Sequence, residues 1–196
     1  MLYSELQCSE AIRQAVERMG FAEMTEIQEK TIPVMLAGHD VIAKAPTGTG
    51  KTCAFGIPVA EHIQPENKYP QAVIMAPTRE LAQQIAEELT NLTYFMPEVQ
   101  VACVYGGANM EKQAKRLAEG CQIVVATPGR LMDHYKHHNI DLSHVTQIVL
   151  DEADEMLNMG FYKDVRHIIE MMKARKALSM FSATISREVM DIGWLY

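Results

Sequence analysis

The sequence predicts an α/β fold in which helices cover both faces of a parallel sheet. Short apolar runs alternate along the chain with amphipathic segments of helical periodicity. The runs at residues 72–76 and 123–126 are apolar without alternation, as in a strand that is buried on both faces. Because strand-like and helix-like segments follow one another in turn, we expect parallel strands joined by helical crossovers.

Six strands are predicted from the apolar runs, at residues 41–44, 72–76, 99–105, 122–126, 147–150 and 177–181. Helical periodicity predicts helices at residues 53–63, 80–92, 110–118, 130–137, 162–174 and from 186 onward. Two more helices, at residues 9–19 and 25–36, are expected before the first strand. The 196 residues contain no repeat or linker and are enough for one domain with a large core.

The composition is that of a soluble globular protein, with 48% apolar and 22% charged residues. No apolar run approaches the roughly 18–20 residues of a membrane span, and the first residues lack the basic-then-apolar pattern of a secretory signal. The four cysteines are scattered without a CxxC pair, so a reducing cytoplasm is the expected location. The net charge of −7 argues against binding nucleic acid through bulk charge, so such binding would need a few placed groups.

A glycine-rich segment, Ala45 to Thr52, separates the first predicted strand from a helix and reads APTGTGKT. Such a turn presents backbone N–H groups and a helix N-terminus to phosphate oxygens. Lys51 is placed to reach the outer phosphates of a nucleoside triphosphate, and the Thr52 hydroxyl is placed to ligate Mg²⁺. The residues expected around the phosphates are Thr47, Gly48, Thr49, Gly50, Lys51 and Thr52. The alternative is a glycine-rich turn without a ligand, since Ala45 stands where the strict pattern begins with glycine.

An acidic segment, Asp151-Glu152-Ala153-Asp154, follows the apolar run at residues 148–150. Because the carboxyl ends of parallel strands lie at one edge of the sheet, it should face the glycine-rich turn. Hydrolysis of a magnesium nucleotide requires one acid that holds the metal and another that accepts a proton from the attacking water. The alternative is an acidic helix start that offsets the N-terminal helix dipole.

Taken together, these two segments make the chain resemble the DEAD-box family of ATP-dependent RNA helicases. Further segments match that family in order and spacing: residues 20–28 its adenine-recognising Q motif, residues 77–82, 106–107 and 127–130 its RNA-contact motifs, and residues 182–184 its coupling motif. The resemblance covers essentially the whole chain. It implies a RecA-like P-loop NTPase domain, with the Q motif within residues 1–36 and with ATP and Mg²⁺ as cofactors.

The resemblance also implies roles in the nucleotide site. Phe21 would stack on adenine, and the Gln28 amide, which both donates and accepts hydrogen bonds, would read its edge. Lys51 would bind the phosphates, Asp151 would hold Mg²⁺ together with Thr52, and Glu152 would activate water. Two positions depart from the family pattern, because Met24 stands where proline is usual and Tyr3 where an upstream phenylalanine is usual.

On the RNA side, the resemblance implies contacts to the RNA backbone, made by small residues and helix N-termini that let N–H groups approach phosphates. The residues concerned are Pro77, Thr78, Arg79, Gly107, Thr127, Pro128, Gly129 and Arg130. Asp154 would bond to Ser182 or Thr184 and so link the nucleotide site to the RNA side.

Purely structural roles stay open for several of these residues. Thr25 and Gln28 have the spacing of a capping box at the start of a helix. A plain helix cap is the structural role open to Thr78, Thr127, Ser182 and Thr184, and an ion pair within the domain is the one open to Arg79 and Arg130. The histidines at positions 134, 137 and 138 are expected on a solvated helix face rather than at a metal.

The sequence is therefore interpreted as the N-terminal half of a cytoplasmic RNA helicase, a monomer when isolated, that contacts RNA and a second RecA-like domain of the same protein. The family's later motifs, including arginines that contact the outer phosphate, have no match in residues 1–196. We therefore expect nucleotide binding with weak hydrolysis at most and no unwinding by this domain alone. Two rivals stay open: a nucleotide-switched RNA clamp or scaffold without turnover, and a DNA-directed translocase of the same superfamily.

Overall fold

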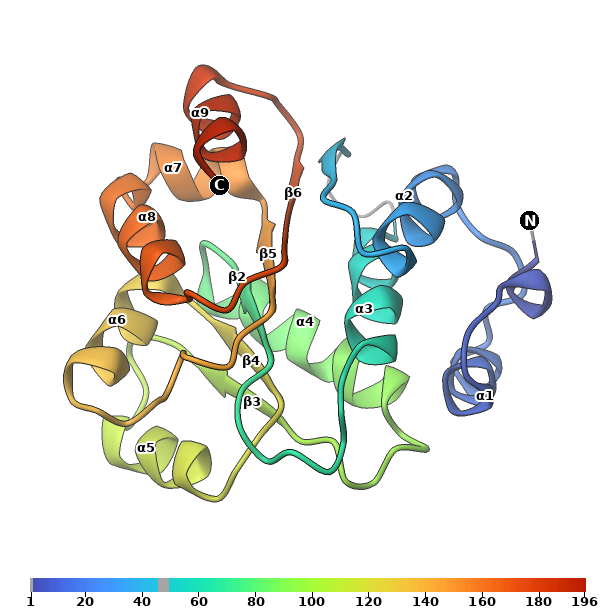
Figure 1. The fold of residues 1–196 in the computed structure, drawn as a ribbon, viewed down its shortest axis with the longest axis horizontal. Coiled ribbons are helices and arrows are strands. Elements are labelled where there is room, and N and C mark those ends of the chain that lie inside the picture. Colours follow the sequence, from blue (N-terminus) through green and yellow to red (C-terminus); the bar gives the residue numbers. More distant parts are fainter. Residues whose placement is uncertain (1, 46–49) are drawn as a thin grey trace.

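The computed structural model describes residues 2–45 and 50–196 (Figure 1). Within them, one sheet is formed by β1 (Ile42–Lys44), β2 (Ala72–Met75), β3 (Val101–Val104), β4 (Ile123–Ala126), β5 (Gln147–Asp151) and β6 (Ala177–Ser182). The strands are all parallel, in the order β1-β6-β5-β2-β4-β3. The predicted fold class is confirmed, and each predicted strand overlaps one of the observed strands.

The helices are α1 (Glu10–Arg18), α2 (Glu26–Leu36), α3 (Lys51–Glu61), α4 (Arg79–Leu92), α5 (Met110–Ala118), α6 (Pro128–Lys136), α7 (Ala153–Asn158), α8 (Tyr162–Met171) and α9 (Arg187–Leu195). A short 3₁₀ helix, η1 (Tyr3–Glu5), precedes them. Sequence periodicity predicts all of these except α7 and η1, which are too short to show a period. No helix in the described part of the chain is both long and apolar enough to cross a membrane.

Two apolar cores, one on each face of the sheet, hold the layers together. Helices α1 to α4 cover one face, and α5 to α9 cover the other. Along β2, Ala72 and Ile74 belong to the first core, whereas Val73 and Met75 belong to the second, and all four are fully buried. This double burial explains why the run is apolar without alternation.

The strand order sorts the chemically interesting segments along the carboxyl edge of the sheet. The neighbours β1, β6 and β5 lead into the glycine-rich turn, the segment 182–184 and the acidic segment 151–154. The neighbours β2, β4 and β3 lead into the segments 77–79, 127–130 and 105–107. One half of the edge therefore carries the expected nucleotide residues, and the other half carries the expected RNA residues.

Candidate functional site

Gly50 of the glycine-rich segment is the N-cap residue of α3. Its backbone is left-handed, with φ of +76°. Its carbonyl oxygen accepts a hydrogen bond of 2.9 Å from Gln28 Nε2. A Cβ atom at this position would lie 2.7 Å from that same nitrogen, so a larger residue would force the Gln28 side chain to shift. Of the other expected phosphate ligands, Thr52 is half-buried in the first turn of α3, whereas Thr47, Gly48 and Thr49 lie outside the described residues.

The side chain of Lys51 contacts both leading acids of the acidic segment. Its Nζ lies 3.1 Å from Asp151 Oδ1 and also pairs with Glu152 Oε1. All three residues are buried, with exposed fractions of 5%, 0% and 6% in chain order. The start of α3 and the end of β5 thus face each other, as the sequence predicts for two loops at one edge of a parallel sheet.

Burial sets the electrostatics of this group of charges. It raises the pKa of Asp151 to about 6, and the attraction of the Lys51 ammonium offsets this only in part. Burial acts to lower the pKa of Lys51, but the nearby Asp151 and Glu152 carboxylates outweigh it and leave that pKa raised. Glu152 has a left-handed backbone with φ of +52°, and its N–H donates to Asp151 Oδ1 at 3.0 Å. A non-glycine residue held in this conformation stores strain, which is common at functional sites.

The residues present fit a magnesium ion. Asp151 Oδ2 is fully buried and has no hydrogen-bond partner in the described part of the chain. A buried carboxylate oxygen without a donor is costly, and a divalent cation would satisfy it. No group of three or more His, Cys, Asp or Glu side chains forms a metal site among the described residues. Mg²⁺ typically binds one or two carboxylates together with substrate phosphates, and Asp151 supplies one such carboxylate.

The structure brings Asp154, Ser182 and Thr184 into contact. Asp154 Oδ2 accepts bonds from the Thr184 hydroxyl at 2.7 Å and from its N–H at 3.1 Å. The Asp154 N–H donates to Ser182 Oγ at 3.1 Å. Partial burial acts to raise the pKa of Asp154. The hydrogen bonds from Thr184 and Ser182 outweigh this effect, so the pKa lies below its usual value. Neither hydroxyl caps α9, because that cap is Ser186, whose side chain accepts from Val189 N–H at 3.2 Å.

The Gln28 amide is already engaged in hydrogen bonds. Its Oε1 accepts from the Thr25 N–H at 3.0 Å, which completes the capping box of α2, and also from the Tyr3 hydroxyl. Nε2 donates to Gly50. Since a carbonyl oxygen has two lone pairs, the second N–H of Nε2 is the group that remains for a base. The capping role is thus present, and the Tyr3 contact limits how Gln28 could read adenine.

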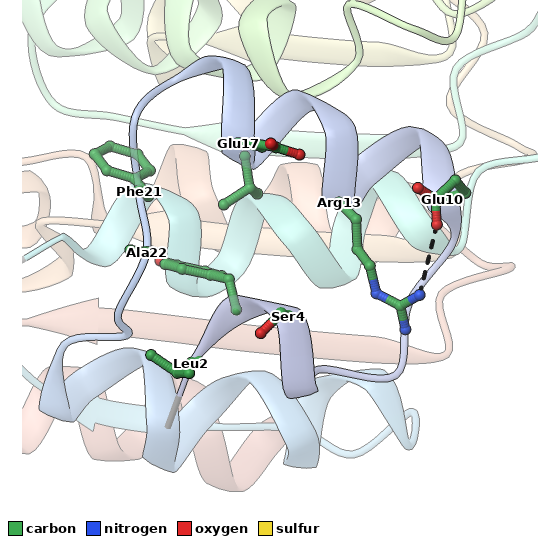
Figure 2. Close-up of a pocket in the computed structure, with 9 residues that line it drawn as sticks. Leu2, Ser4, Glu10, Arg13, Glu17, Phe21 and Ala22 are labelled. Carbon is green, nitrogen blue, oxygen red and sulfur yellow. Dashed lines mark ion pairs between the residues drawn. The ribbon is translucent and has the colours of Figure 1, made fainter.

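Phe21 lies at one end of a cavity of about 330 Å³ between η1 and α1 (Figure 2). Its side chain is 41% exposed, and its ring stacks loosely on that of Tyr3, with centroids 6.3 Å apart. At the other end of the cavity, Arg13 and Glu10 form an ion pair of 3.7 Å (Figure 2). Phe21 is therefore accessible to a ligand, but its role toward adenine stays a prediction.

Two of the expected RNA residues, Thr78 and Thr127, occupy the N-cap positions of helices. Thr78 caps α4, with its hydroxyl accepting from Leu81 N–H at 3.2 Å, behind the buried Pro77. Thr127 occupies the N-cap position of α6, with Pro128 in the first turn, but its side chain makes no capping bond. Both helices therefore present their N-terminal ends at the carboxyl edge of the sheet.

The remaining RNA candidates lie around the segment 105–108. Gly107 has φ of +85°, and a Cβ atom there would lie 3.7 Å from Arg79 Nη1. The exposed Arg79 lies over the Tyr105 ring, 4.9 Å from its centroid. Arg130 Nη1 donates to Ala108 O at 3.0 Å and to Gln113 Oε1 at 3.1 Å. The ion pairs considered for the two arginines are not recorded among the described residues. Gly129 is half-buried, and a Cβ atom there would meet only ordinary packing.

The expectation of a solvated histidine face is wrong for His134. Its ring is fully buried, with Nε2 against Gln113 Oε1 at 3.0 Å and Nδ1 against Asn139 Nδ2 at 3.1 Å. His137 and His138 are exposed as expected. Neither Gln113 nor His134 was predicted as a functional residue. Each is one polar residue among several in an amphipathic helix, and nothing in the sequence distinguishes it from its neighbours.

The sequence pattern that defines the DEAD/DEAH box helicases matches residues 25–192. The chain belongs to the DEAD/DEAH box helicase family. This DEAD-box chain is 49% identical to the ATP-dependent RNA helicase CshA of Limosilactobacillus reuteri, over 98% of the chain and 39% of that protein. It is 43% identical to the ATP-dependent RNA helicase DeaD of Escherichia coli, over 97% of the chain and 30% of that protein.

A solved structure shows the same fold. The crystal structure of a DEAD box protein from the hyperthermophile Methanococcus jannaschii matches this DEAD-box chain with a TM-score of 0.92 and 40% identity, over the full chain and 53% of the other. The RecA-like fold expected from the family resemblance is thereby confirmed. The chain spans well under two thirds of the lengths of these relatives.

Proposed function

We propose that this chain is the ATP-binding half of an RNA-dependent ATPase and helicase. The observation that carries the proposal is the contact of Lys51 with Asp151 and Glu152 at the carboxyl edge of the sheet. A lysine and two acids at this edge are the groups that bind and hydrolyse a magnesium nucleotide. The relatives named as ATP-dependent RNA helicases support the same reaction.

Each residue then has a defined task. When phosphates bind, Lys51 leaves the carboxylates and pairs with the outer phosphates. Asp151 Oδ2, which has no hydrogen-bond partner among the described residues, and the Thr52 hydroxyl would hold Mg²⁺, which would neutralise charge on the phosphates. Glu152 accepts a proton from the attacking water. Gln28 and Phe21 contact the base.

RNA is proposed to bind the other half of the edge through its backbone. Thr78, Gly107 and Thr127 offer N–H groups at a turn or a helix start, and Arg79 and Arg130 add charge. A second RecA-like domain of the same protein would supply the remaining phosphate contacts and close over ATP and RNA. We propose a cytoplasmic protein, and a monomer for the isolated domain, with little activity of its own.

The test is the ATPase rate of the full-length protein with and without RNA. We expect RNA to stimulate turnover, and no stimulation by any RNA would refute the proposal. A DNA oligomer of the same sequence that stimulates equally would favour the DNA translocase. The variant Glu152→Gln separates an enzyme from a clamp. It should bind ATP but lose turnover by about 10²–10⁴-fold, whereas unchanged turnover would remove Glu152 from its role.

A further inference from the structure

Two of the three RNA segments, 105–107 and 127–130, are joined by a buried polar cluster around Gln113 of α5. The Gln113 side chain is 8% exposed, and its Nε2 donates to Tyr105 O at 3.0 Å. Its Oε1 accepts from Arg130 Nη1 at 3.1 Å and from His134 Nε2 at 3.0 Å. One amide thus uses both its donor and its acceptor to connect the end of β3 with α6.

His134 has a defined hydrogen-bonding state in this cluster. Gln113 Oε1 can only accept, so His134 Nε2 carries the proton. Asn139 Nδ2 can only donate, so Nδ1 is the unprotonated nitrogen and the ring is neutral. Burial and the charge of Arg130 lower the pKa of His134, in agreement with a neutral ring. His134 and Arg130 are four residues apart on α6, so both reach Gln113 from one helix face.

The same cluster determines which nitrogens of the Arg130 guanidinium are already hydrogen-bonded within the protein. The hydrogen bonds recorded for Arg130 among the described residues both use Nη1, toward Ala108 O and Gln113 Oε1. Its Nε and Nη2 groups are therefore left for a phosphate. The link continues through Tyr105, whose ring lies under Arg79 and whose hydroxyl accepts from Gln83 Nε2 at 3.0 Å. The segment 77–79 is thus connected to this cluster only through the exposed contact of Arg79 with Tyr105.

We propose that Gln113 and His134 are positioning residues for RNA-backbone binding, holding Arg130 and the segment 105–108 in one arrangement before RNA arrives. Neither side chain touches RNA, because both are buried. Ordering these loops in advance lowers the entropy that binding would otherwise cost. The inference rests on the proposed function, since it assigns a role within the RNA surface proposed above.

The test compares Gln113→Leu with Gln122→Leu in the full-length protein. Gln122 is a matched control, because it too is buried and donates from Nε2 to Pro65 O and Glu98 O, both at 2.9 Å. Its Oε1 accepts from Gln100 N–H at 2.8 Å. Gln122 precedes β4, whereas the RNA segment 127–130 follows β4, so the control breaks similar bonds at the opposite sheet edge.

We expect Gln113→Leu to raise the RNA concentration for half-maximal ATPase stimulation by about tenfold, because buried donors and an acceptor lose their partner. The affinity for ATP without RNA, and the rate at saturating RNA, should stay within about twofold of wild type. Gln122→Leu should lower thermal stability to a similar degree without changing the RNA requirement. His134→Phe keeps a ring of similar size but removes one bond to Gln113, so it should raise the RNA requirement by a smaller factor. This variant replaces Gln113→Leu in the test if Gln113→Leu does not fold.

The outcomes separate this inference from the proposed function. Wild-type protein that shows no RNA stimulation overturns both. Wild-type protein that is stimulated, with equal RNA requirements in the Gln113 and Gln122 variants, overturns the positioning role alone. An unchanged RNA requirement in His134→Phe, or an equal loss of ATP affinity and RNA affinity in Gln113→Leu, also contradicts it.

Discussion

Asp151 is buried in the folded chain with a pKa of about 6, above the value of about 4 for an exposed aspartate. The folded state therefore binds the proton more tightly than the unfolded state does. The stability that Asp151 contributes is fully present below about pH 4 and is lost as the pH rises through about 6. A pKa shift of about two units corresponds to a change of about 3 kcal/mol in the free energy of unfolding.

We therefore predict that Asp151→Asn gains stability relative to wild type as the pH rises from 4 to 7, because the neutral amide never becomes a buried charge. The measurement is the free energy of unfolding of both proteins by denaturant across this range. Asp154→Asn is a control, because hydrogen bonds from Thr184 and Ser182 hold the pKa of Asp154 below its usual range. A difference between Asp151→Asn and wild type that does not vary with pH would contradict the prediction.

Tyr3 is the residue whose departure from the family pattern has a visible consequence. Its hydroxyl donates to Gln28 Oε1 and occupies an acceptor position that the adenine amino group would need. We predict that Tyr3→Phe increases the preference for ATP over GTP by a few-fold, roughly the value of one hydrogen bond. Competition titrations with the two nucleotides would measure it. If both proteins bind ATP and GTP equally well, Gln28 acts as a helix cap only.

At the scale of elements, α3 begins at Gly50 against the side chains of Gln28 and Thr25 at the start of α2. We predict that Gly50→Ala destabilises the chain more than Gly38→Ala does. Both glycines are left-handed, with φ of +76° and +87°, so both variants incur a backbone cost of about 1–2 kcal/mol. At Gly38 a Cβ atom would meet nothing within 4 Å, whereas at Gly50 it would meet Gln28 Nε2 at 2.7 Å. Thermal unfolding of the two variants measures the difference, and equal losses would show that this contact carries no cost.

The elements that sequence reasoning predicts are those with enough residues to show a period. The fully buried runs of β2 and β4 are apolar throughout, and the cap residues Thr25 and Thr78 mark their helices correctly. Helix α7 has six residues and begins after Glu152, whose left-handed backbone follows from tertiary packing rather than from local preference. The close approach of Lys51 to Asp151 follows from parallel topology. The Tyr3, Gln113 and His134 contacts do not, because they depend on how individual side chains pack and not on the order of the strands.

At the scale of the molecule, the halves of the sheet edge that we propose to bind nucleotide and RNA are separate sets of strands. β5 is the strand at the boundary, since it pairs with β6 on one side and with β2 on the other. Asp154 follows β5 and is bonded to Ser182 and Thr184, which lie at and just beyond the end of β6. A change in the acidic segment on nucleotide binding would therefore reach the end of β6 through these bonds.

We predict that the double variant Ser182→Ala with Thr184→Ala keeps its affinity for ATP but unwinds fewer base pairs for each ATP hydrolysed. The substitutions remove the hydroxyl contacts to Asp154, at 2.7 Å and 3.1 Å, and leave Lys51, Asp151 and Glu152 in place. The measurement pairs a duplex-unwinding assay with the ATPase rate of the full-length protein. Ser186→Ala is the matched control, because it removes a neighbouring hydroxyl that only caps α9 and should cost about 1 kcal/mol of stability. Equal unwinding for each ATP in the double variant and the wild type would show that these bonds stabilise the fold without coupling ATP hydrolysis to unwinding.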